Sequence, residues 1–418
     1  MTQRPVTVLI VGAGSRGTTY SGFAKMFPER MQVVGVAEPR DFYRERLAQE
    51  HAIPPKRVFR DWQAAASRPR MADVVIIATQ DNMHVEPAVA FAGLGYAILL
   101  EKPMAPDEAG CRKIYEAVKA NQNMFGVCHV LRYTAYTQAL KKMIASGAIG
   151  DVISIQHLEP VGYWHMAHSF VRGNWRNEAE SSFMLLAKSC HDIDWISYVM
   201  GAKVSAVSSF GSLNHFRRDQ QPEGASDRCL DCVVEPNCPY SAKKIYLGML
   251  ARGITGWPVN VVTPEPTEEK LVAALRTGPY GRCVYACDND VVDHQVVNLQ
   301  FAGGPTASFT MTGFTHLGNR KTRIFGTRGE LTGDGAVIQH LDFLTDQTHT
   351  IDTRLADEHN AMGGHGGGDF GLMDHFIAAV AQNDPGLILS GPEESFDSHR
   401  TVFASEQARR EHRVVDLG

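Results

Sequence analysis

The sequence lacks a long hydrophobic run, an excess of positive charge and an internal repeat. Its longest apolar stretch, residues 88–100, is interrupted by Gly93 and Gly95 and is too short to cross a bilayer. The formal net charge is −5 at pH 7, and no basic cluster alternates with aromatic residues, which argues against nucleic-acid binding. Residues 5–12 lack the basic region and cleavage site of a signal peptide. We therefore expect a cytoplasmic protein without nucleic-acid or membrane partners.

The composition is that of a folded globular protein, with 44% hydrophobic and 21% charged residues. A chain of 418 residues is longer than one hydrophobic core usually organises, so two domains are expected. The eight cysteines are expected to be free thiols or metal ligands rather than a disulfide framework.

The most informative motif is a glycine loop that directly follows the apolar run at residues 6–11. Gly12, Gly14 and Gly17 have the spacing of a dinucleotide-binding fingerprint. The first glycine permits a tight turn, the second lets backbone N–H groups approach a pyrophosphate, and the third lets the next helix pack closely. Glu38 ends the following strand, where a carboxylate would accept the ribose hydroxyls.

The first 130 residues alternate apolar runs with helical segments, which predicts βαβ units and a parallel sheet. Cofactors bind at the carboxyl ends of such strands. The expected cofactor-binding residues are Gly12, Gly14, Ser15, Arg16, Gly17, Glu38, Arg40, Thr79, Asn82, His84, Glu101 and Lys102. Because Glu38 would repel a 2′-phosphate, NAD is expected rather than NADP, although Arg40 could soften this preference.

After about residue 131 the pattern changes. Strands expected at residues 291–302, 306–314, 321–326 and 337–343 do not alternate with helices, which predicts a largely antiparallel sheet. The expected fold is α/β, with an N-terminal Rossmann dinucleotide-binding domain (1–130) and a C-terminal α+β domain with an open sheet (131–418). The second domain is expected to bind substrate and to oligomerise, and residues 213–285 form a cysteine-bearing insert within it.

Five motifs occur in one order along nearly the whole chain. They are the glycine fingerprint, Ala78-Thr79 with His84, Glu101-Lys102-Pro103, Ser146-Gly147-Ala148-Ile149-Gly150 and His191-Asp192-Ile193-Asp194. With these motifs the chain resembles the Gfo/Idh/MocA (glucose–fructose oxidoreductase / inositol dehydrogenase) family. The resemblance implies hydride transfer between a nicotinamide and a secondary hydroxyl or ketone of a sugar or cyclitol. It also implies an open C-terminal sheet that commonly forms a dimer or tetramer interface.

Two expected catalytic residues lie where the resemblance places the groups that handle the hydroxyl proton. Lys102 can hydrogen bond the carbinol oxygen, and His191, expected at the start of a helix, can carry a proton near neutral pH. The sequence departs from the family at position 187, where Ala stands in place of the usual Asp. Lys188 is the candidate to supply the missing polar group. Tyr163 and His165 complete the expected catalytic set.

The loop of residues 159–180 is rich in groups that bind sugars, since Trp and Tyr stack on sugar rings while His and Arg bond hydroxyls. An ordinary solvated loop and a metal pair at His165 and His168 are alternatives. Arg172, Arg176 and Lys188 could together neutralise an anionic group of the substrate. The expected substrate-binding residues are Arg132, Tyr133, Trp164, His168, Arg172, Trp175, Arg176 and, in the glycine-rich loop at 363–368, His365.

The insert carries cysteines at metal-ligand spacing. Cys229, Cys232 and Cys238 with Cys283 are expected to bind a structural zinc, with Cys287 as the substitute ligand and free thiols as the alternative. Zinc would hold an insert whose apolar content looks too low to hold itself.

Three functions follow from these motifs. The first is NAD-dependent hydride transfer on a sugar, cyclitol or glycoside, an anionic sugar included. The second is a redox-neutral NAD-dependent glycosidase, which oxidises the sugar transiently, eliminates the aglycone, adds water and returns the hydride. In this reaction the loop of Tyr163 and His165 would supply the acid and the base. The third is a non-catalytic NAD-binding regulator, against which the presence of Lys102 and His191 counts. The expected partners are a small sugar or glycoside and further copies of the chain, as a homodimer or homotetramer.

Overall fold

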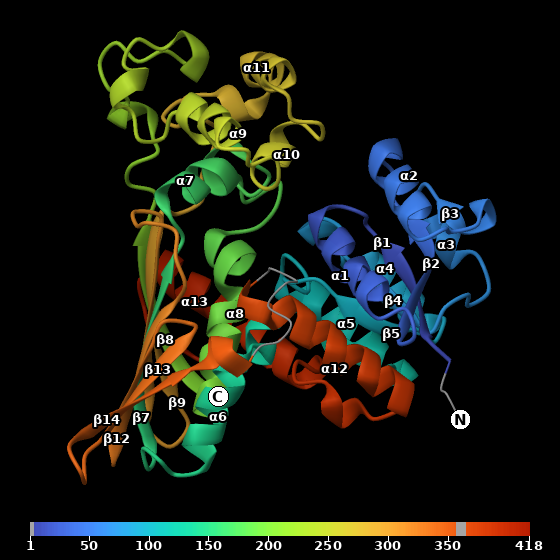
Figure 1. Ribbon diagram of the computed structural model, residues 1–418. Coiled ribbons are helices and arrows are strands. Elements are labelled where there is room, and N and C mark those ends of the chain that lie inside the picture. The colour runs from blue at the N-terminus through green and yellow to red at the C-terminus, as the bar shows by residue number, and fades with distance from the viewer. Residues whose placement is uncertain (1–3, 357–364) are drawn as a thin grey trace.

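The structure, a computed structural model, describes residues 4–356 and 365–418. Two sheets stand at an angle to each other, with helices between and around them (Figure 1). Of the glycine-rich loop, Gly363 and Gly364 lie outside the described residues. Within the described ranges, no helix combines the length and the hydrophobicity that crossing a bilayer requires.

The N-terminal sheet is a parallel, doubly wound sheet of six strands in the order β3-β2-β1-β4-β5-β6. Central strands such as β4 are fully buried because helices cover both faces. The expected Rossmann fold is confirmed. Its strands are β1 (Val6–Val11), β2 (Met31–Ala37), β3 (Val58–Phe59), β4 (Val74–Ile77), β5 (Ala97–Leu100) and β6 (Phe125–Val127), and its helices are α1 (Ser15–Met26), α2 (Asp41–Glu50), α3 (Trp62–Ala66), α4 (Val85–Gly93) and α5 (Glu108–Asn121).

The end of the chain returns to this first sheet. Helix α12 (Gly368–Gln382) places Leu372, Met373 and Phe376 in the same apolar core as β1. Helix α13 (Pro392–Glu411) packs against α5 and also against α8 of the second half. The two C-terminal helices therefore hold the two halves of the chain together, and a domain boundary at residue 130 stays a prediction.

The second sheet has nine strands in the order β14-β13-β12-β11-β7-β10-β9-β8-β15. All neighbours are antiparallel except β7 and β10, so the expected, largely antiparallel sheet is confirmed. Helices α6 (Ala135–Ala145) and α8 (Met184–Met200) cover one face. The strands are β7 (Val152–Pro160), β8 (Val204–Ser212), β9 (His294–Phe301), β10 (Thr306–Thr312), β11 (Lys321–Gly326), β12 (Gly329–Gly333), β13 (Val337–Asp342), β14 (Gln347–Asp352) and β15 (Val415–Asp416).

The other face of this sheet is open. In β9, Val297 and Leu299 are buried under the helices, while Asn298 and Gln300 alternate with them and face outward. Phe210 and Val296, which pair across β8 and β9, are exposed on this open face.

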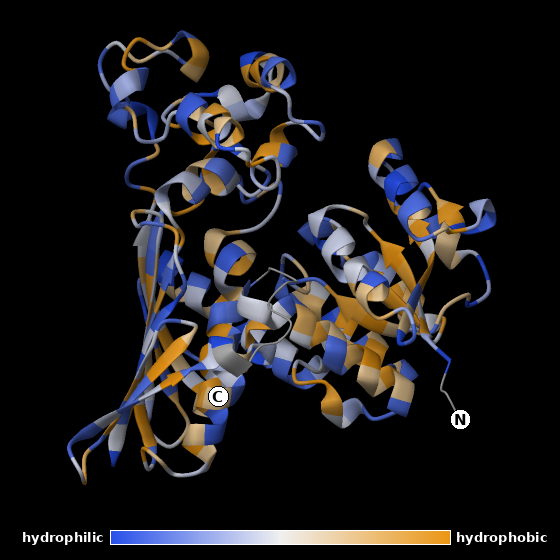
Figure 2. Cartoon of the chain, viewed as in Figure 1, coloured by the Kyte–Doolittle hydropathy of each residue, from blue (hydrophilic) through white to orange (hydrophobic). Residues whose placement is uncertain are grey.

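The insert at residues 213–285 lies beyond one end of the second sheet (Figure 1). Its buried Phe216, Tyr246, Leu271 and Leu275 belong to the core of the second half, and Figure 2 shows apolar residues on its short helices. The expectation that the insert has too little apolar content to hold itself is wrong. Its helices are α9 (Gly248–Ala251), α10 (Val259–Val262) and α11 (Glu268–Thr277), and it packs against α7 (Tyr163–His165) and the π-helical turns of Met166–Arg172.

Candidate active site

The glycine loop after β1 has the geometry of a pyrophosphate cradle. Gly12 has a φ of +92°, and a Cβ there would lie 2.4 Å from the Ala78 carbonyl oxygen. A Cβ on Gly17 would lie 2.0 Å from the Gly12 carbonyl oxygen, so neither position accepts a side chain. Helix α1 begins after Gly14 with no side-chain cap. Its first N–H groups therefore fit the anionic bridge of a dinucleotide.

Glu38 lies where β2 ends and is almost fully buried. Its Oε2 accepts a hydrogen bond from the Ala13 amide at 2.8 Å, and Arg40 Nε donates to its Oε1 at 2.7 Å. Burial alone would raise the pKa of Glu38, but the hydrogen bonds from Arg40 and Ala13 outweigh it and lower the pKa. A charged carboxylate, partly covered by Arg40, therefore stands beside the glycine loop.

Two loops at the ends of β4 and β5 are tied together by His84. This side chain is fully buried, with Nδ1 at 2.7 Å from the Pro103 carbonyl oxygen and Nε2 at 3.3 Å from the Thr79 carbonyl oxygen. His84 is thus engaged by backbone groups, whereas Asn82 is exposed and Thr79 half-buried at the same strand ends.

Glu101 fixes the backbone from which Lys102 extends. Its Oε1 accepts hydrogen bonds from Arg16 Nε and the Tyr20 hydroxyl, both at 2.6 Å, and its Oε2 accepts from the Lys102 amide at 2.7 Å. Arg16 also pairs with Asp369 at the start of α12 at 2.5 Å. Glu101 and Arg16 therefore join α1, β5 and α12 behind the site.

Lys102 reaches across to the second half of the molecule. Its Nζ donates to the carbonyl oxygen of Ala187 in α8 at 2.7 Å. Asp81, at the end of β4, lies near Lys102; burial raises the pKa of Asp81, while His84 and Lys102 act in the opposite direction. Trp175 also stabilises the Asp81 carboxylate. Sequence reasoning missed Asp81, which belongs to no motif.

Lys188 and His191 lie one turn apart on α8, so both side chains project from the same side of the helix. Helix α8 begins at Met184, so the expectation that His191 starts a helix is wrong. Lys188 Nζ pairs with Glu159 Oε1 at 2.6 Å. Burial lowers the pKa of Lys188, and Glu159 opposes that shift.

A buried guanidinium links these groups. Arg320 lies just before β11, and its Nη2 is 2.7 Å from His191 Nε2. Arg320 Nε pairs with Asp192 Oδ1 at 2.8 Å and with Glu159 Oε2 at 2.7 Å. The His365 ring lies 6.0 Å from that of His191. Glu159 and Arg320 were not found from the sequence, since neither belongs to a local motif.

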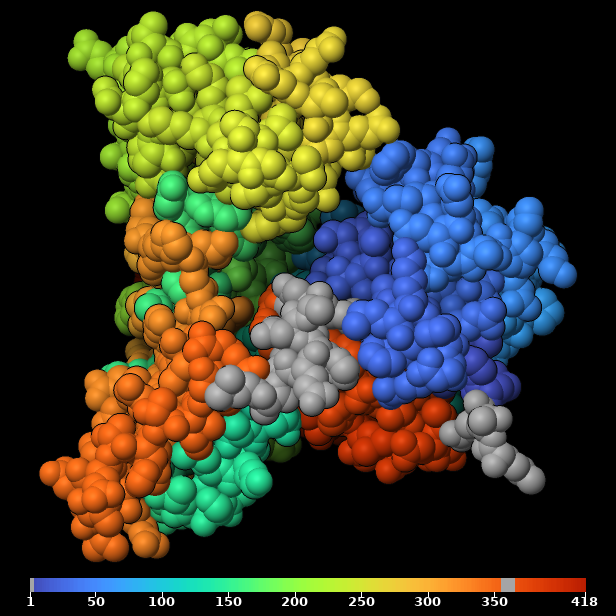
Figure 3. All heavy atoms as spheres, in the orientation of Figure 1, coloured from blue at the N-terminus to red at the C-terminus, as the bar shows by residue number. Residues whose placement is uncertain are grey.

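The aromatic loop and the insert meet at the edge of this site. Trp257 of the insert packs on Trp164, with ring centroids 5.1 Å apart, and on His165, at 4.9 Å. Burial lowers the pKa of His165, and Lys188 acts in the same direction. Trp257 is 42% exposed and Tyr163 is also exposed. Figure 3 shows a hollow between the insert and the N-terminal domain.

Several expected substrate residues are engaged by partners within the protein. His168 is buried with Nδ1 at 2.9 Å from the Tyr246 hydroxyl. Arg172 is buried, donates to the carbonyl oxygens of Tyr240 and Arg282 and, among the described residues, forms no ion pair. Arg176 pairs with Asp288 at 2.9 Å and with Glu180 at 2.9 Å. Because these partners and Glu159 engage the three cations, the structure does not bring Arg172, Arg176 and Lys188 together as an anion site.

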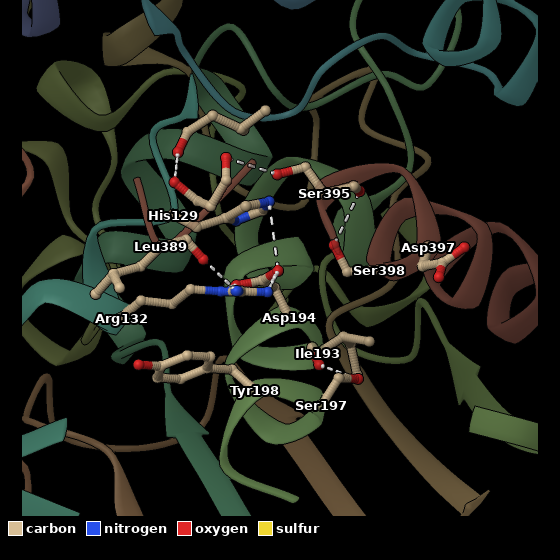
Figure 4. A network of polar contacts seen from close by, with 12 residues as sticks. His129, Arg132, Ile193, Asp194, Ser197, Tyr198, Leu389, Ser395, Asp397 and Ser398 are labelled. Carbon is tan, nitrogen blue, oxygen red and sulfur yellow. Dashed lines mark hydrogen bonds and ion pairs between the residues drawn. The ribbon is translucent and has the colours of Figure 1, made fainter. Parts of the chain in front are cut away.

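Arg132 and Tyr133 hold the segment before α13. Arg132 donates to both oxygens of Asp194 at 2.7 Å and to the Leu389 carbonyl oxygen (Figure 4). The Tyr133 hydroxyl lies 2.9 Å from Ser390 Oγ. Both side chains are buried and engaged by these partners, and their expected role in substrate binding stays a prediction.

The cysteines of the insert do not form a metal centre in the described residues, where no three His, Cys, Asp or Glu side chains are placed to hold an ion. All eight cysteines are free thiols, and Cys229 Sγ lies 3.5 Å from Arg172. The predicted zinc site therefore has no support from the structure, and burial of aromatic and aliphatic side chains holds the insert instead.

Comparison with known proteins matches both halves. Residues 6–129 match the model of an oxidoreductase family, NAD-binding Rossmann fold, and residues 141–417 match the C-terminal alpha/beta domain of the same family, GFO_IDH_MocA. The oxidoreductase YteT of Bacillus subtilis is 24% identical over 77% of this chain and 76% of its own length. The 2,7-anhydro-N-acetylneuraminate hydratase of Escherichia coli is 26% identical over 34% of this chain and 37% of its own. A structure of levoglucosan dehydrogenase with NADH covers 99% of this chain and 100% of its own, with a TM-score of 0.70 and 20% identity.

Proposed function

Because the chain belongs to the Gfo/Idh/MocA oxidoreductase family, with its NAD-binding Rossmann domain, we propose that it oxidises or reduces a secondary hydroxyl or ketone of a sugar, cyclitol or glycoside. The proposal rests on one observation, the contact between Lys102 and helix α8 beside the glycine loop. The Lys102 ammonium lies on the Ala187 carbonyl, and Lys188 and His191 follow on the same helix.

The residues around the glycine loop would hold the dinucleotide. Gly12, Gly14 and Gly17 leave room for its pyrophosphate at the start of α1, and Glu38 would accept hydrogen bonds from the adenosine ribose. Asn82 and Thr79 stand at the neighbouring strand ends. When bound, the nicotinamide accepts a hydride from the carbinol carbon or returns it.

The lysines would act on the substrate oxygen. Lys102 donates to a backbone carbonyl, a partner that a substrate hydroxyl can replace at little cost. Burial lowers the pKa of Lys188 while Glu159 opposes the shift, and this lysine is our second candidate for exchanging a proton with the substrate oxygen. Trp164 and Trp257, with the exposed Tyr163, offer flat apolar surfaces for a sugar ring at the edge of the site.

A redox-neutral reaction is the second candidate. It is favoured by position 187, where the carboxylate of the polyol dehydrogenase pattern is replaced by Ala and a lysine follows. The similarity to a 2,7-anhydro-N-acetylneuraminate hydratase points the same way, since that name describes addition of water rather than net oxidation. In that reaction His165, which lies near enough to Lys188 for the lysine to lower its pKa, and Tyr163 are the candidates for elimination and water addition.

One incubation separates the two reactions. The purified protein is mixed with NAD and a panel of free sugars, cyclitols and p-nitrophenyl glycosides, and NADH and nitrophenol are measured together. NADH that accumulates with a free sugar supports the dehydrogenase. Nitrophenol released without accumulating NADH supports the redox-neutral reaction. If neither product forms with any compound, while NAD binds, the non-catalytic regulator is favoured.

The open face of the second sheet is the proposed contact between copies of the chain. Phe210 is 62% exposed there beside Val296, and a second copy would cover both. Light scattering on wild type and Phe210→Lys tests this, and a wild-type monomer contradicts it. We also propose a cytoplasmic location, which the eight free thiols support.

A further inference from the structure

The contact between Arg320 and His191 decides which ring nitrogen carries the proton. Arg320 Nη2 lies 2.7 Å from His191 Nε2. A guanidinium group is always charged and has donors but no acceptor. The Nε2 atom must therefore accept, so the proton of the neutral ring lies on Nδ1. Asp192 Oδ2 is farther from the same nitrogen, at 3.3 Å, and Asp192 is itself bonded to Arg320.

The cation at Arg320 is firmly held. Its Nε lies between Asp192 Oδ1 and Glu159 Oε2, at 2.8 and 2.7 Å. Burial alone would lower the pKa of Arg320, but these two carboxylates outweigh it and raise the pKa. Lys188 takes the other oxygen of Glu159, so each carboxylate has a defined partner. Arg320 is thus a fixed donor in front of His191.

The surroundings keep the ring of His191 neutral. Burial lowers the pKa of His191 well below the ordinary value. Asp192, on the same helix, opposes this shift. Arg320 and Lys102, which lies just after β5, lower the pKa further. His365, from the segment before α12, faces the ring at 6.0 Å. In the described part of the chain, the buried Nδ1 atom has no hydrogen-bond partner. A buried N–H group without a partner is costly, which marks it as a place for a ligand oxygen.

We infer that Arg320 is a positioning residue that holds His191 as the neutral Nδ1–H tautomer, so that His191 donates a hydrogen bond to the reacting oxygen of the substrate and does not accept its proton. A carboxylate in the place of Arg320 would have the opposite effect. It would accept a hydrogen bond from Nε2 and make Nδ1 the basic nitrogen. This chain has Ala187 at the carboxylate position and a guanidinium on the ring instead. An N–H donor stabilises the negative charge that develops on the oxygen. The inference rests on the proposed function for the identity of the ligand, and it leaves proton transfer to Lys102 and Lys188.

Nitrogen NMR of the full chain, labelled with ¹⁵N-histidine and free of cofactor, tests the tautomer directly. The His191 signals are those lost in His191→Asn. We expect a protonated Nδ1 and an unprotonated Nε2 at neutral pH in the wild type. A wild type with the proton on Nε2, or on both nitrogens, overturns the inference. This measurement needs no substrate, so it stands even if the substrate class is wrong.

Two variants separate the role of Arg320 from a general effect on folding. In Arg320→Met the proton should move to Nε2, where Asp192 can accept it, and Arg320→Lys should keep the wild-type pattern. Arg323→Met is the matched control, because Arg323 lies three residues further along, within β11, and pairs with Glu330 at the surface. It should leave the His191 signals unchanged. An unchanged tautomer in a folded Arg320→Met overturns the positioning role.

Once a substrate is known, the pH profile of kcat/KM gives a second readout. The wild type should show no ionisation from His191 near neutral pH, and Arg320→Met should gain one. If the tautomer is as expected but none of the sugars reacts, the proposed function fails and the tautomer stands. If a sugar reacts and wild-type activity falls with protonation of His191, the donor role is wrong while the proposed function survives.

Discussion

Replacing Lys102 by Ala should abolish most of the activity and leave the fold intact. In the folded protein the Nζ atom makes a single hydrogen bond, to the Ala187 carbonyl at 2.7 Å, and it forms no ion pair among the described residues. A hydrogen bond of this kind contributes about 0.5–1.5 kcal/mol to stability. The melting temperature should therefore fall by no more than a few degrees.

The effect on turnover should be much larger than the effect on stability. A positioned acid–base group contributes about 10²–10⁴-fold to the rate, which equals about 3–5 kcal/mol of barrier height. The cofactor cradle does not depend on the Lys102 side chain, because Glu101 binds its backbone amide. NAD affinity, measured by fluorescence titration or calorimetry, should stay within about threefold of wild type.

The assay compares Lys102→Ala and Lys102→Arg with Lys56→Ala, which removes an exposed lysine far from the site. Rates are measured with whichever sugar or glycoside the wild type converts. Near-wild-type turnover in Lys102→Ala would refute the catalytic role. A loss of NAD affinity equal to the loss of rate would instead show that Lys102 acts on cofactor binding.

Three further predictions concern the cofactor, the interior and the insert. Glu38→Gln should lessen discrimination against NADP by about tenfold, since one like-charge contact is removed; paired titrations with NAD and NADP measure this, and an unchanged ratio contradicts it. Asp194→Asn should destabilise the fold by about 3–5 kcal/mol at neutral pH, because it leaves Arg132 buried without its carboxylate. Burial alone would raise the pKa of Asp194, but Arg132 outweighs burial and the pKa is lowered. The Asp194 carboxylate therefore stabilises the folded protein above its unfolded pKa near ~4, and this stabilisation is lost as the pH falls. Denaturant unfolding at several pH values should show a weaker loss of stability in acid for Asp194→Asn than for the wild type. A chelator should shift the melting temperature by less than about 1 °C, because apolar packing holds the insert; zinc found by elemental analysis, together with a large shift, would contradict this.

The first half of the fold could be predicted from the sequence because its signals are local. The glycine loop, the apolar run before it and Glu38 after the next strand all lie within one βαβ unit. The same holds for Lys102, which lies two residues after the end of the buried strand β5. In these places residues that are close in the sequence determine the local structure, so the sequence pattern is enough to predict it.

The polar network around His191 could not be predicted, because it is assembled by pairing distant strands. The register of β11 on β7 sets Lys321 opposite Leu158, and this places Arg320 beside Glu159. Neither residue is close in sequence to His191. No local spacing signals such a contact, and only the sheet register creates it.

The substrate loop shows a different limit. Its composition predicted a sugar site, yet two of its cations are engaged by other parts of the protein. Arg172 lies in a π-helical turn and donates to carbonyl oxygens under the insert, and Arg176 pairs with Asp288. Residue type indicates what a side chain can bind, whereas the direction of the turn decides whether it meets solvent or the core. One of the two exposed aromatic groups at the edge of the site, Trp257, comes from the insert, and the other, Tyr163, from the loop itself.

Lys102 and His191 have different partners in this site: the Lys102 ammonium contacts the Ala187 carbonyl, and the His191 ring contacts the Arg320 guanidinium. With His191 held as a donor by Arg320, the groups left to exchange a proton with the substrate are the lysines, one of which has a pKa lowered by burial. The site therefore suits a reaction in which an amine takes the proton while the His191 N–H group donates a hydrogen bond to the substrate oxygen. In a site built on a carboxylate–histidine pair, the histidine itself would take the proton.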